Sequence, residues 1–271
     1  EHNSSSDFEG AYRLKWIEKI GNDHPNIDYE EAEKCIVLTH SKRHLSKVKW
    51  ACKLKQLLAE VKTDMKTYDA ALISVYLSLE AARKWLFAAI RPPWHHAEKE
   101  KPMWFCYFNN IACATSMLVS EWKKVCIIDI DWHHWNGTEK IFYKNPNVLY
   151  ISIHESNSYP HSWLTTRTWE KDWKWLNINM PIVAGSWDKD VLERLTSVKD
   201  RILDFWPDNI WVSAWFDCYY KDKLLNLEMT LDWYWDVWKY IKSLNKPTFA
   251  VLEWWYHEDV VKCIEVFCEN V

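Results

Sequence analysis

The chain has 271 residues, of which 48% are hydrophobic and 27% are charged, and its formal net charge is −4. This composition allows a packed core and excludes disordered and fibrous proteins, and the lack of a basic surplus argues against a nucleic-acid or anionic-membrane binder. The longest uncharged run, residues 102–120, contains proline, asparagine and cysteine and does not suit a membrane span. Eight cysteines without a CxxC pair are typical of reduced thiols, so we expect an intracellular, cytoplasmic protein.

Helical and extended patterns alternate along the chain. The spacing of apolar residues predicts helices over 44–61, 67–86, 188–205, 231–244 and 259–269, and strands over 87–90, 124–130, 148–153, 209–214 and 247–252. We therefore expect an α/β fold with one domain over residues 1–271, in which helices cover both faces of a central, mostly parallel β-sheet.

Polar residues gather where four of the expected strands end. The runs are RPPWHHAE at 91–98, DIDWHHWNGT at 129–138, FD at 216–217 and EWWYH at 253–257. In open parallel sheets, ligands bind beyond the carboxyl ends of the strands, so these runs predict one functional site.

Three of these residues suit a metal ion. Asp131 and His133 alternate in an extended segment and share a face, and Asp217 at another strand end can supply a third ligand. One imidazole and two carboxylates leave an open position, as a catalytic Zn²⁺ site requires. A lone Asp-x-His is more often a cap or a loop contact, but the neighbouring strand ends favour a metal site here.

Two adjacent histidines suit proton transfer at the same edge. His95 and His96 point in different directions and need separate partners, and the candidates are Asp129 for His95 and the amide of Asn136 for His96. Taken alone, a His-His pair is as often a surface accident.

Aromatic residues in these runs have two interpretations each. The Tyr256 hydroxyl can donate a hydrogen bond to a carbonyl oxygen that gains charge in a transition state, or it is an ordinary half-buried loop tyrosine. Phe105 and Tyr159 suit the walls of an apolar channel, although aromatic residues near strand ends are more often part of the core.

The order and spacing of these runs resemble the histone deacetylase superfamily, zinc-dependent amide hydrolases with the arginase–deacetylase fold, in its class II-like and bacterial form. The matching runs lie in family order from about His40 to the end of the chain, at 91–97, 104–110, 129–138, 152–154, 213–217 and 252–257. The family's first strand precedes the segment that Glu1 resembles, so we expect this chain to lack that strand.

The resemblance implies a role for each matching residue. Zinc, or ferrous iron in its place, is held by Asp131, His133 and Asp217. The catalytic residues are His95 paired with Asp129, His96 beside Asn136, and Tyr256, which polarises the acyl carbonyl. The acyl-lysine tunnel is flanked by Phe105 and Tyr159, with Leu224 at its mouth. A structural potassium ion is held by Asp129, Asp131, His133, Ser152 and Ile153.

The activity implied is removal of an acetyl or other acyl group from lysine in a protein or peptide, or from a related small N-acyl amine. An acetylpolyamine amidohydrolase is the alternative. Leu224 stands where polyamine-specific relatives can have a glutamate, which favours a neutral substrate end. A catalytically dead acyl-lysine-binding or scaffold protein is the alternative of another class. No nucleic-acid or membrane partner is expected, and no oligomeric state is predicted.

Glycine and tryptophan occur in unusual numbers, 4 and 21. A chain of this length usually holds about 19 glycines. Tryptophan stands at many positions where the family has glycine: Trp94, Trp104, Trp135, Trp163, Trp169, Trp173, Trp175, Trp187, Trp215, Trp254 and Trp255. Some bacterial lineages read the codon UGA as glycine, so translation of UGA as tryptophan explains this pattern, and we expect glycine in the protein that the cell makes. The rival is a genuinely tryptophan-rich chain with a blocked site.

Overall fold

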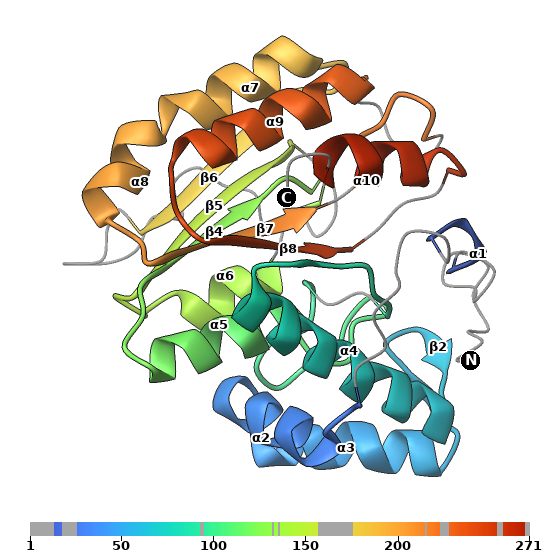
Figure 1. Ribbon diagram of the computed structural model, residues 1–271. Helices are drawn as coiled ribbons and strands as arrows, with labels where there is room; N and C mark the ends of the chain where they lie inside the picture. Colours follow the sequence, from blue (N-terminus) through green and yellow to red (C-terminus); the bar gives the residue numbers. More distant parts are fainter. Residues whose placement is uncertain are drawn as a thin grey trace.

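The computed structural model describes residues 14–17, 26–92, 95–131, 133–134, 136–156, 176–214, 216–222, 228–253 and 257–268. Within them, six parallel strands form one sheet in the order β3-β8-β7-β4-β5-β6 (Figure 1). These strands are β3 (Phe87–Ala88), β4 (Val125–Asp129), β5 (Val148–Glu155), β6 (Asn177–Ile182), β7 (Asn209–Ala214) and β8 (Thr248–Leu252). A second, antiparallel pair consists of β1 (Leu57–Leu58) and β2 (Val61–Lys62).

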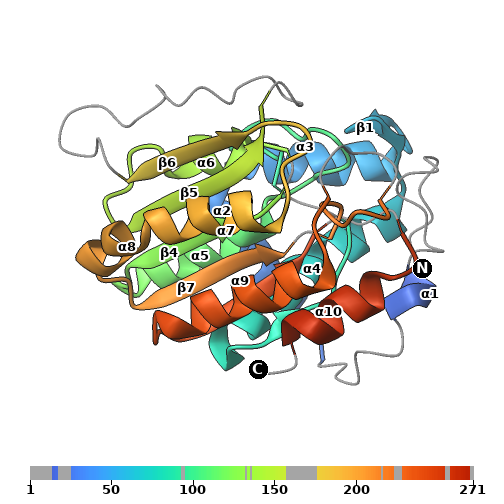
Figure 2. The same ribbon diagram turned by 90° about the horizontal axis from the view of Figure 1, so that it is seen from above.

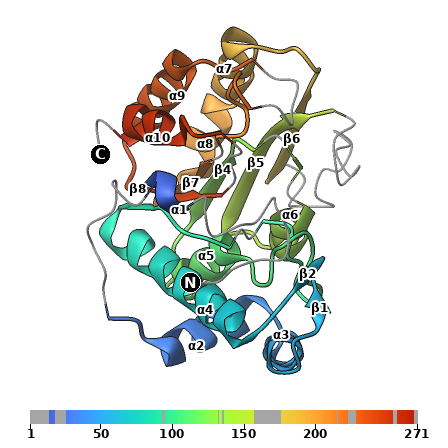
Figure 3. The ribbon, with the colours of Figure 1, turned by 90° about the vertical axis from the view of Figure 1, so that its right-hand side faces the viewer.

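Helices cover both faces of the large sheet. One face carries α7 (Asp188–Ser197), α8 (Lys199–Phe205), α9 (Leu231–Ser243) and α10 (Val260–Cys268), with the short α1 (Leu14–Ile17) beside α10 (Figure 2). The opposite face carries α2 (Tyr29–Thr39), α3 (Lys42–Lys53), α4 (Met65–Lys84), α5 (Asn110–Ser120) and α6 (Asn136–Phe142) (Figure 3). This arrangement confirms the predicted α/β fold. Among the described helices, none is both long and apolar enough to cross a lipid bilayer.

Alternating side chains of the strands build an apolar core on each face of the sheet. In β4, Cys126 and Ile128 join the core under α7–α10, while Val125 and Ile127 join the core on the side of α2–α5. Every residue of β4 and β5 is buried. The side chains within these two strands therefore pack in the interior, and polar side chains gather at and beyond the strand ends.

Two predicted helices differ from the structure. The helix predicted over 44–61 ends at Lys53, and the chain then reverses through the β1–β2 pair, where Ala59 and Glu60 have positive φ angles of 49° and 71°. Lys55, two residues after the end of α3, has a φ of 54°, and a helix cannot continue through a left-handed residue, which explains the early end. The helix predicted over 188–205 is divided at Val198, which ends α7 and begins α8.

Three helices are followed by a tryptophan in the left-handed region. Trp85 (φ 60°) follows α4, Trp122 (φ 66°) follows α5 and Trp206 (φ 54°) follows α8. This is the position that glycine most often takes at the end of a helix, because a residue with a Cβ atom costs about 1–2 kcal/mol in that conformation. The backbone therefore favours glycine at these three further positions.

Two of the tryptophans that the resemblance assigns to glycine lie in the described part of the chain. Trp104 has a φ of 44°, where glycine is favoured. Trp187 has a φ of −128°, an extended conformation that any residue adopts, so its backbone gives no reason for glycine. The other nine fall outside the described residues. The expectation that the family's first strand, which precedes the segment that Glu1 resembles, is missing stays a prediction.

Candidate metal and catalytic site

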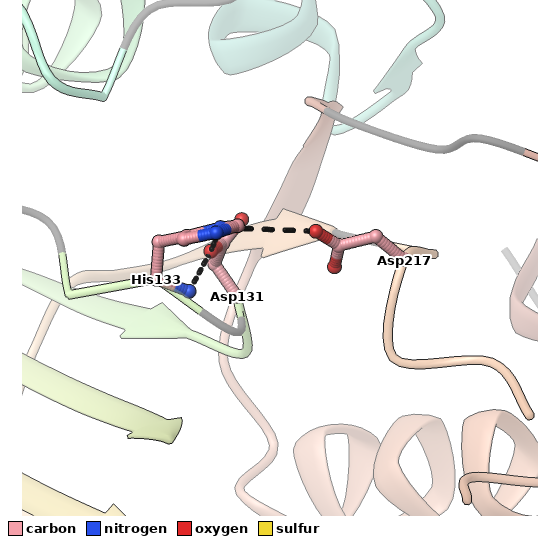
Figure 4. A group of neighbouring side chains, drawn as sticks. All are labelled: Asp131, His133 and Asp217. Carbon is pink, nitrogen blue, oxygen red and sulfur yellow. Dashed lines mark hydrogen bonds and ion pairs between the residues drawn. The ribbon is translucent and has the colours of Figure 1, made fainter. Parts of the chain in front are cut away.

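Asp131, His133 and Asp217 lie together beyond the carboxyl ends of β4 and β7 (Figure 4). These strands are neighbours, with Asp129 opposite Ser213, so the segments that follow them leave the sheet side by side. The His133 Nδ1 atom lies 3.4 Å from Asp131 Oδ1 and 3.9 Å from Asp217 Oδ2, and all three side chains are buried. One ligand atom from each residue lies within 4.8 Å of the others.

The group fits a divalent ion such as zinc. Tetrahedral ligands bound at about 2.1 Å lie roughly 3.4 Å apart, close to the distances found here. Burial raises the pKa of Asp131 well above its usual value, and the neighbouring Asp217 carboxylate raises it further. A cation between the two carboxylates would remove this repulsion, and the imidazole nitrogen of His133 completes a donor set typical of zinc.

Burial favours the neutral form of the imidazoles in the site. Burial lowers the pKa of His133 to about 3 and the pKa of His96 to about 4. Burial also lowers the pKa of His95 well below its usual value, and the neighbouring imidazoles lower it further. A neutral imidazole offers a nitrogen lone pair, which can bind a metal or accept a proton.

Asp129 lies directly behind the metal-binding group. Its Oδ1 atom accepts the backbone N–H of Asp131 at 2.9 Å, and its Oδ2 atom accepts the hydroxyl of Tyr150 at 3.3 Å. The His95 ring lies with its centroid 3.8 Å from that of His96. The pairing of His95 with Asp129 stays a prediction.

The histidine segment packs tightly against α6 and α5. A Cβ atom at Gly137 would lie 2.5 Å from the carbonyl oxygens of both His95 and Ala97, so only glycine fits there. From the α5 side, the Asn109 amide donates to the same two carbonyls, at 3.4 and 3.3 Å. His96 Nδ1 lies 3.0 Å from Asn136 Oδ1, so the structure brings these two residues together.

A buried polar network holds the segment that follows His133. His134 Nε2 lies 3.1 Å from Asn179 Oδ1. Asn177 and Asn179 donate to Glu139 Oε1 at 2.7 and 3.0 Å. The network ties the metal-binding segment to α6 and β6.

Trp104 covers part of the site. Its ring packs edge-on against His96 and His133, with centroid distances of 5.3 and 5.1 Å. Phe105 is buried next to it, and its backbone N–H donates to the Ala59 carbonyl at 3.0 Å. The indole therefore occupies space beside the metal-binding residues that a glycine would leave open.

Other predicted site residues are only partly described. Outside the described residues lie Tyr159, Leu224 and Tyr256. Among the residues expected to hold potassium, the Ser152 hydroxyl is 2.8 Å from His154 Nδ1, and the Ile153 side chain packs in the core under α7–α10. The potassium site stays a prediction.

Three residues near the site have no role assigned from the sequence, although two of them, Glu98 and Glu253, lie in the polar runs that predict the site. Glu98 accepts a hydrogen bond from Asn136 at 3.0 Å, and Tyr150 donates to Asp129. Burial raises the pKa of Asp129 well above its usual value, and the charge of buried Glu253 contributes to the rise. The sequence signals that point to these residues are their positions. Glu98 follows the histidine pair, Tyr150 lies on β5 and Glu253 directly follows β8.

The sequence pattern of the histone deacetylase domain matches residues 12–269. The chain belongs to the histone deacetylase family. This confirms the resemblance found in the sequence, and Asp131, His133 and Asp217 lie within the matched range.

The chain is also similar to individual proteins. The uncharacterized protein MJ0535 of Methanocaldococcus jannaschii is 36% identical over 182 residues, which cover 62% of this chain and 53% of that protein. The acetylpolyamine amidohydrolase of Burkholderia pseudomallei is 33% identical over 174 residues, which cover 63% of this chain and 51% of that protein. The matched residues thus span about half the length of these relatives.

Solved structures of the family share the fold over nearly the whole chain. The HD domain of HDA15 superposes with a TM-score of 0.86 at 25% identity, covering 99% of this chain and 86% of that one. The acetylpolyamine aminohydrolase from Burkholderia pseudomallei gives a TM-score of 0.81 at 25% identity, covering 96% of this chain and 88% of that one.

Proposed function

We propose that the chain is a zinc-dependent amide hydrolase that removes an acetyl or related acyl group from the side-chain amine of lysine or a similar N-acyl amine. The observation that carries the proposal is the buried group of Asp131, His133 and Asp217 beside two neutral histidines, in a chain of the histone deacetylase family. Zinc is the expected metal, with ferrous iron as the alternative.

The protein's own residues would move the protons. When bound, zinc supplies a Lewis acid that polarises the acyl carbonyl and makes water more acidic. His96 Nδ1 lies 3.0 Å from Asn136 Oδ1, and with the proton on Nδ1 the Nε2 atom would accept a proton from water. The protonated imidazole, or that of neighbouring His95, then returns a proton to the leaving amine. Tyr256 is expected to donate a hydrogen bond to the carbonyl oxygen.

Access for an extended acyl-amine substrate depends on position 104. The Trp104 ring packs against His96 and His133, where the acyl group would have to enter. We therefore propose that the active protein has glycine at position 104 and at the other family glycine positions. Acetyl-lysine is the first substrate candidate. Acetylated polyamines are the second, supported by the similarity to the acetylpolyamine amidohydrolase.

The decisive test compares two forms of the chain, one with tryptophan and one with glycine at the family glycine positions. Both are purified, loaded with zinc and assayed with an acetyl-lysine peptide and an acetylated polyamine. We expect hydrolysis by the glycine form only. In that form, Asp217→Asn should lower kcat/KM by about 10³-fold or more, because several kcal/mol of charge stabilisation are lost.

Asp208→Asn is the control for removal of an aspartate. Asp208 precedes β7 at the opposite end of the strands, where its carboxylate accepts the Lys124 backbone N–H at 2.7 Å. This variant should keep the parent rate. Hydrolysis by Asp217→Asn at the parent rate would contradict the proposed metal site. Faster turnover of the acetylated polyamine than of the acetyl-lysine peptide would show that polyamines are the preferred substrate.

A further inference from the structure

A chain of four side chains runs from His96 to the protein surface. His96 Nδ1 lies 3.0 Å from Asn136 Oδ1, and Asn136 Nδ2 donates to Glu98 Oε1 at 3.0 Å. Lys140 Nζ, one helical turn after Asn136 on α6, lies 2.5 Å from the same Glu98 oxygen. The two inner residues are buried, while the side chains of Glu98 and Lys140 are 22% and 46% exposed.

The polarity of this chain is set at its outer end. A carboxylate only accepts hydrogen bonds, so Glu98 requires the amide nitrogen of Asn136 to face it. The amide oxygen then faces His96 and can only accept a hydrogen bond. In a neutral imidazole one nitrogen carries the proton and the other carries the lone pair, so the proton lies on Nδ1 and the lone pair on Nε2.

We propose that Glu98 is a positioning residue that fixes the tautomer of His96 through the amide of Asn136. Without the carboxylate, the amide of Asn136 can turn over and present its nitrogen to His96, which would place the proton on Nε2. The catalytic consequence of this rests on the proposed deacylase function, whereas the tautomer itself does not.

The backbone of Glu98 is fixed independently of its side chain. Its carbonyl accepts a hydrogen bond from His40 Nδ1 at 3.0 Å, and its N–H donates to the Lys101 carbonyl at 2.9 Å. Glu98 therefore holds the amide from an anchored position. A partly exposed ion pair with Lys140 alone would contribute little to stability and would have no effect on His96.

The test reads the tautomer directly by ¹⁵N NMR of histidine-labelled protein in the glycine form, with the His96 signals assigned by their loss in His96→Gln. We expect the Nδ1–H tautomer in the parent and a mixture or the Nε2–H tautomer in Glu98→Ala. Glu98→Gln should restore the parent signal, because its amide oxygen can still accept from Asn136. It also preserves side-chain size, so it tests the proposal if the alanine variant folds poorly.

Glu100→Ala is the matched control. Glu100 lies two residues further along the same loop, but its carboxylate accepts the Ser41 hydroxyl at 2.6 Å, and it should leave the His96 signals unchanged. An unchanged tautomer in Glu98→Ala, or the same change in Glu100→Ala, would overturn the proposal.

Kinetics separate this proposal from the proposed function. In zinc-loaded Glu98→Ala we expect kcat to fall about 10-fold with KM unchanged, less than the roughly 10²–10⁴-fold that complete loss of a general base costs. A tautomer change without a change in kcat supports the role of Glu98 and counts against His96 as the proton acceptor. If the glycine form with Glu98 intact hydrolyses neither substrate, the proposed function is overturned. The NMR result then still decides the role of Glu98.

Discussion

Some single residues that cannot be replaced hold the segment of His95 and His96 in place. Gly137 is the clearest case, because its Cα lies where any side chain would strike the backbone of the His95–Ala97 segment. The same α6 residue follows Asn136, so displacement of the helix would also move the partner of His96. A defect at this position should therefore appear in both stability and catalysis.

We predict that Gly137→Ala lowers the free energy of unfolding by about 1–3 kcal/mol or more, the cost of overpacking, and lowers kcat/KM. Urea unfolding and hydrolysis assays measure the two effects. Gly185→Ala is the control, because Gly185 has a φ of 81° but no atom within 4 Å of an added Cβ. It should lose stability through its left-handed backbone and keep full activity. Equal loss of activity in both variants would contradict the packing argument.

His40 links stability to pH. Its Nδ1 donates to the Glu98 carbonyl at 3.0 Å and its Nε2 accepts the Asn109 N–H at 2.9 Å, while burial lowers its pKa from 6.5 to about 3. Because the folded-state pKa lies below the unfolded one, His40 contributes stability that is present above pH 6.5 and is lost as the pH falls toward 3.

We predict that this residue accounts for a loss of about 2 kcal/mol in the free energy of unfolding between pH 7 and pH 5. The amide of His40→Gln does not titrate, so that variant should show a shallower pH dependence by this amount. Urea unfolding at several pH values checks it. The stacked neighbour His44 also has a pKa lowered by burial and remains in both proteins, so it cancels in the comparison. An unchanged slope would show that His40 takes up no proton on unfolding.

At the scale of elements, apolar runs were predictable and special backbone conformations were not. The strands β4, β5, β7 and β8 are runs of buried apolar residues, and the sequence pattern predicts each of them within two residues. The pattern fails for β6 (NINMPI), because its asparagines and Pro181 are unusual in strands and are tolerated here at the end of the strand order. It also fails for α6, whose second residue is glycine, and for α2 and α5.

The residues of the candidate site likewise fall into a predictable and an unpredictable group. Alternation after a strand and the sheet-edge rule were enough to group Asp131, His133 and Asp217. The function of Glu98 depends on the direction in which an amide from another segment points, and no spacing in the sequence encodes that direction.

The left-handed tryptophans after α4, α5 and α8 lead to a prediction for helix ends. Trp85→Gly, Trp122→Gly and Trp206→Gly should each raise the free energy of unfolding by about 1 kcal/mol through relief of backbone strain. Trp122→Gly should gain the most stability, because the Trp122 side chain is 90% exposed and little packing is lost. Trp206→Gly should gain less, because it also loses the contact with Lys246 Nζ, which lies 3.9 Å from the ring centroid.

Trp50→Gly provides the control. Trp50 is 59% exposed but lies inside α3, where glycine costs about 0.5–1 kcal/mol instead of relieving strain. Thermal or urea unfolding of the four variants should give opposite signs for the helix ends and the helix interior. Destabilisation at all four positions would exclude strain at the helix ends.

For the whole molecule, the number of tryptophans at glycine positions matters more than any one of them. Individual costs of about 1–3 kcal/mol at many places would together be comparable to the roughly 5–15 kcal/mol that keeps a domain folded. We predict that peptide mass spectrometry of the protein from its natural source finds glycine at positions 94, 104, 135, 215, 254 and 255.

Trp211 is the internal control in the same experiment. It lies in β7, is fully buried and packs against Phe249 with a centroid distance of 3.7 Å, so glycine there would leave a large cavity. It should remain tryptophan. Tryptophan at all of the tested positions would establish a blocked relative without deacylase activity.

The parallel pairing of β4 with β7 determines when the metal site becomes complete during synthesis. Asp131 and His133 leave the ribosome first, and Asp217 follows about 80 residues later, a delay of roughly 4–16 s at usual elongation rates. Until β7 docks beside β4, the nascent chain offers two ligands and holds a metal ion only weakly. Binding of the proposed metal ion should therefore be a late event in the biogenesis of this protein, after β7 has docked beside β4.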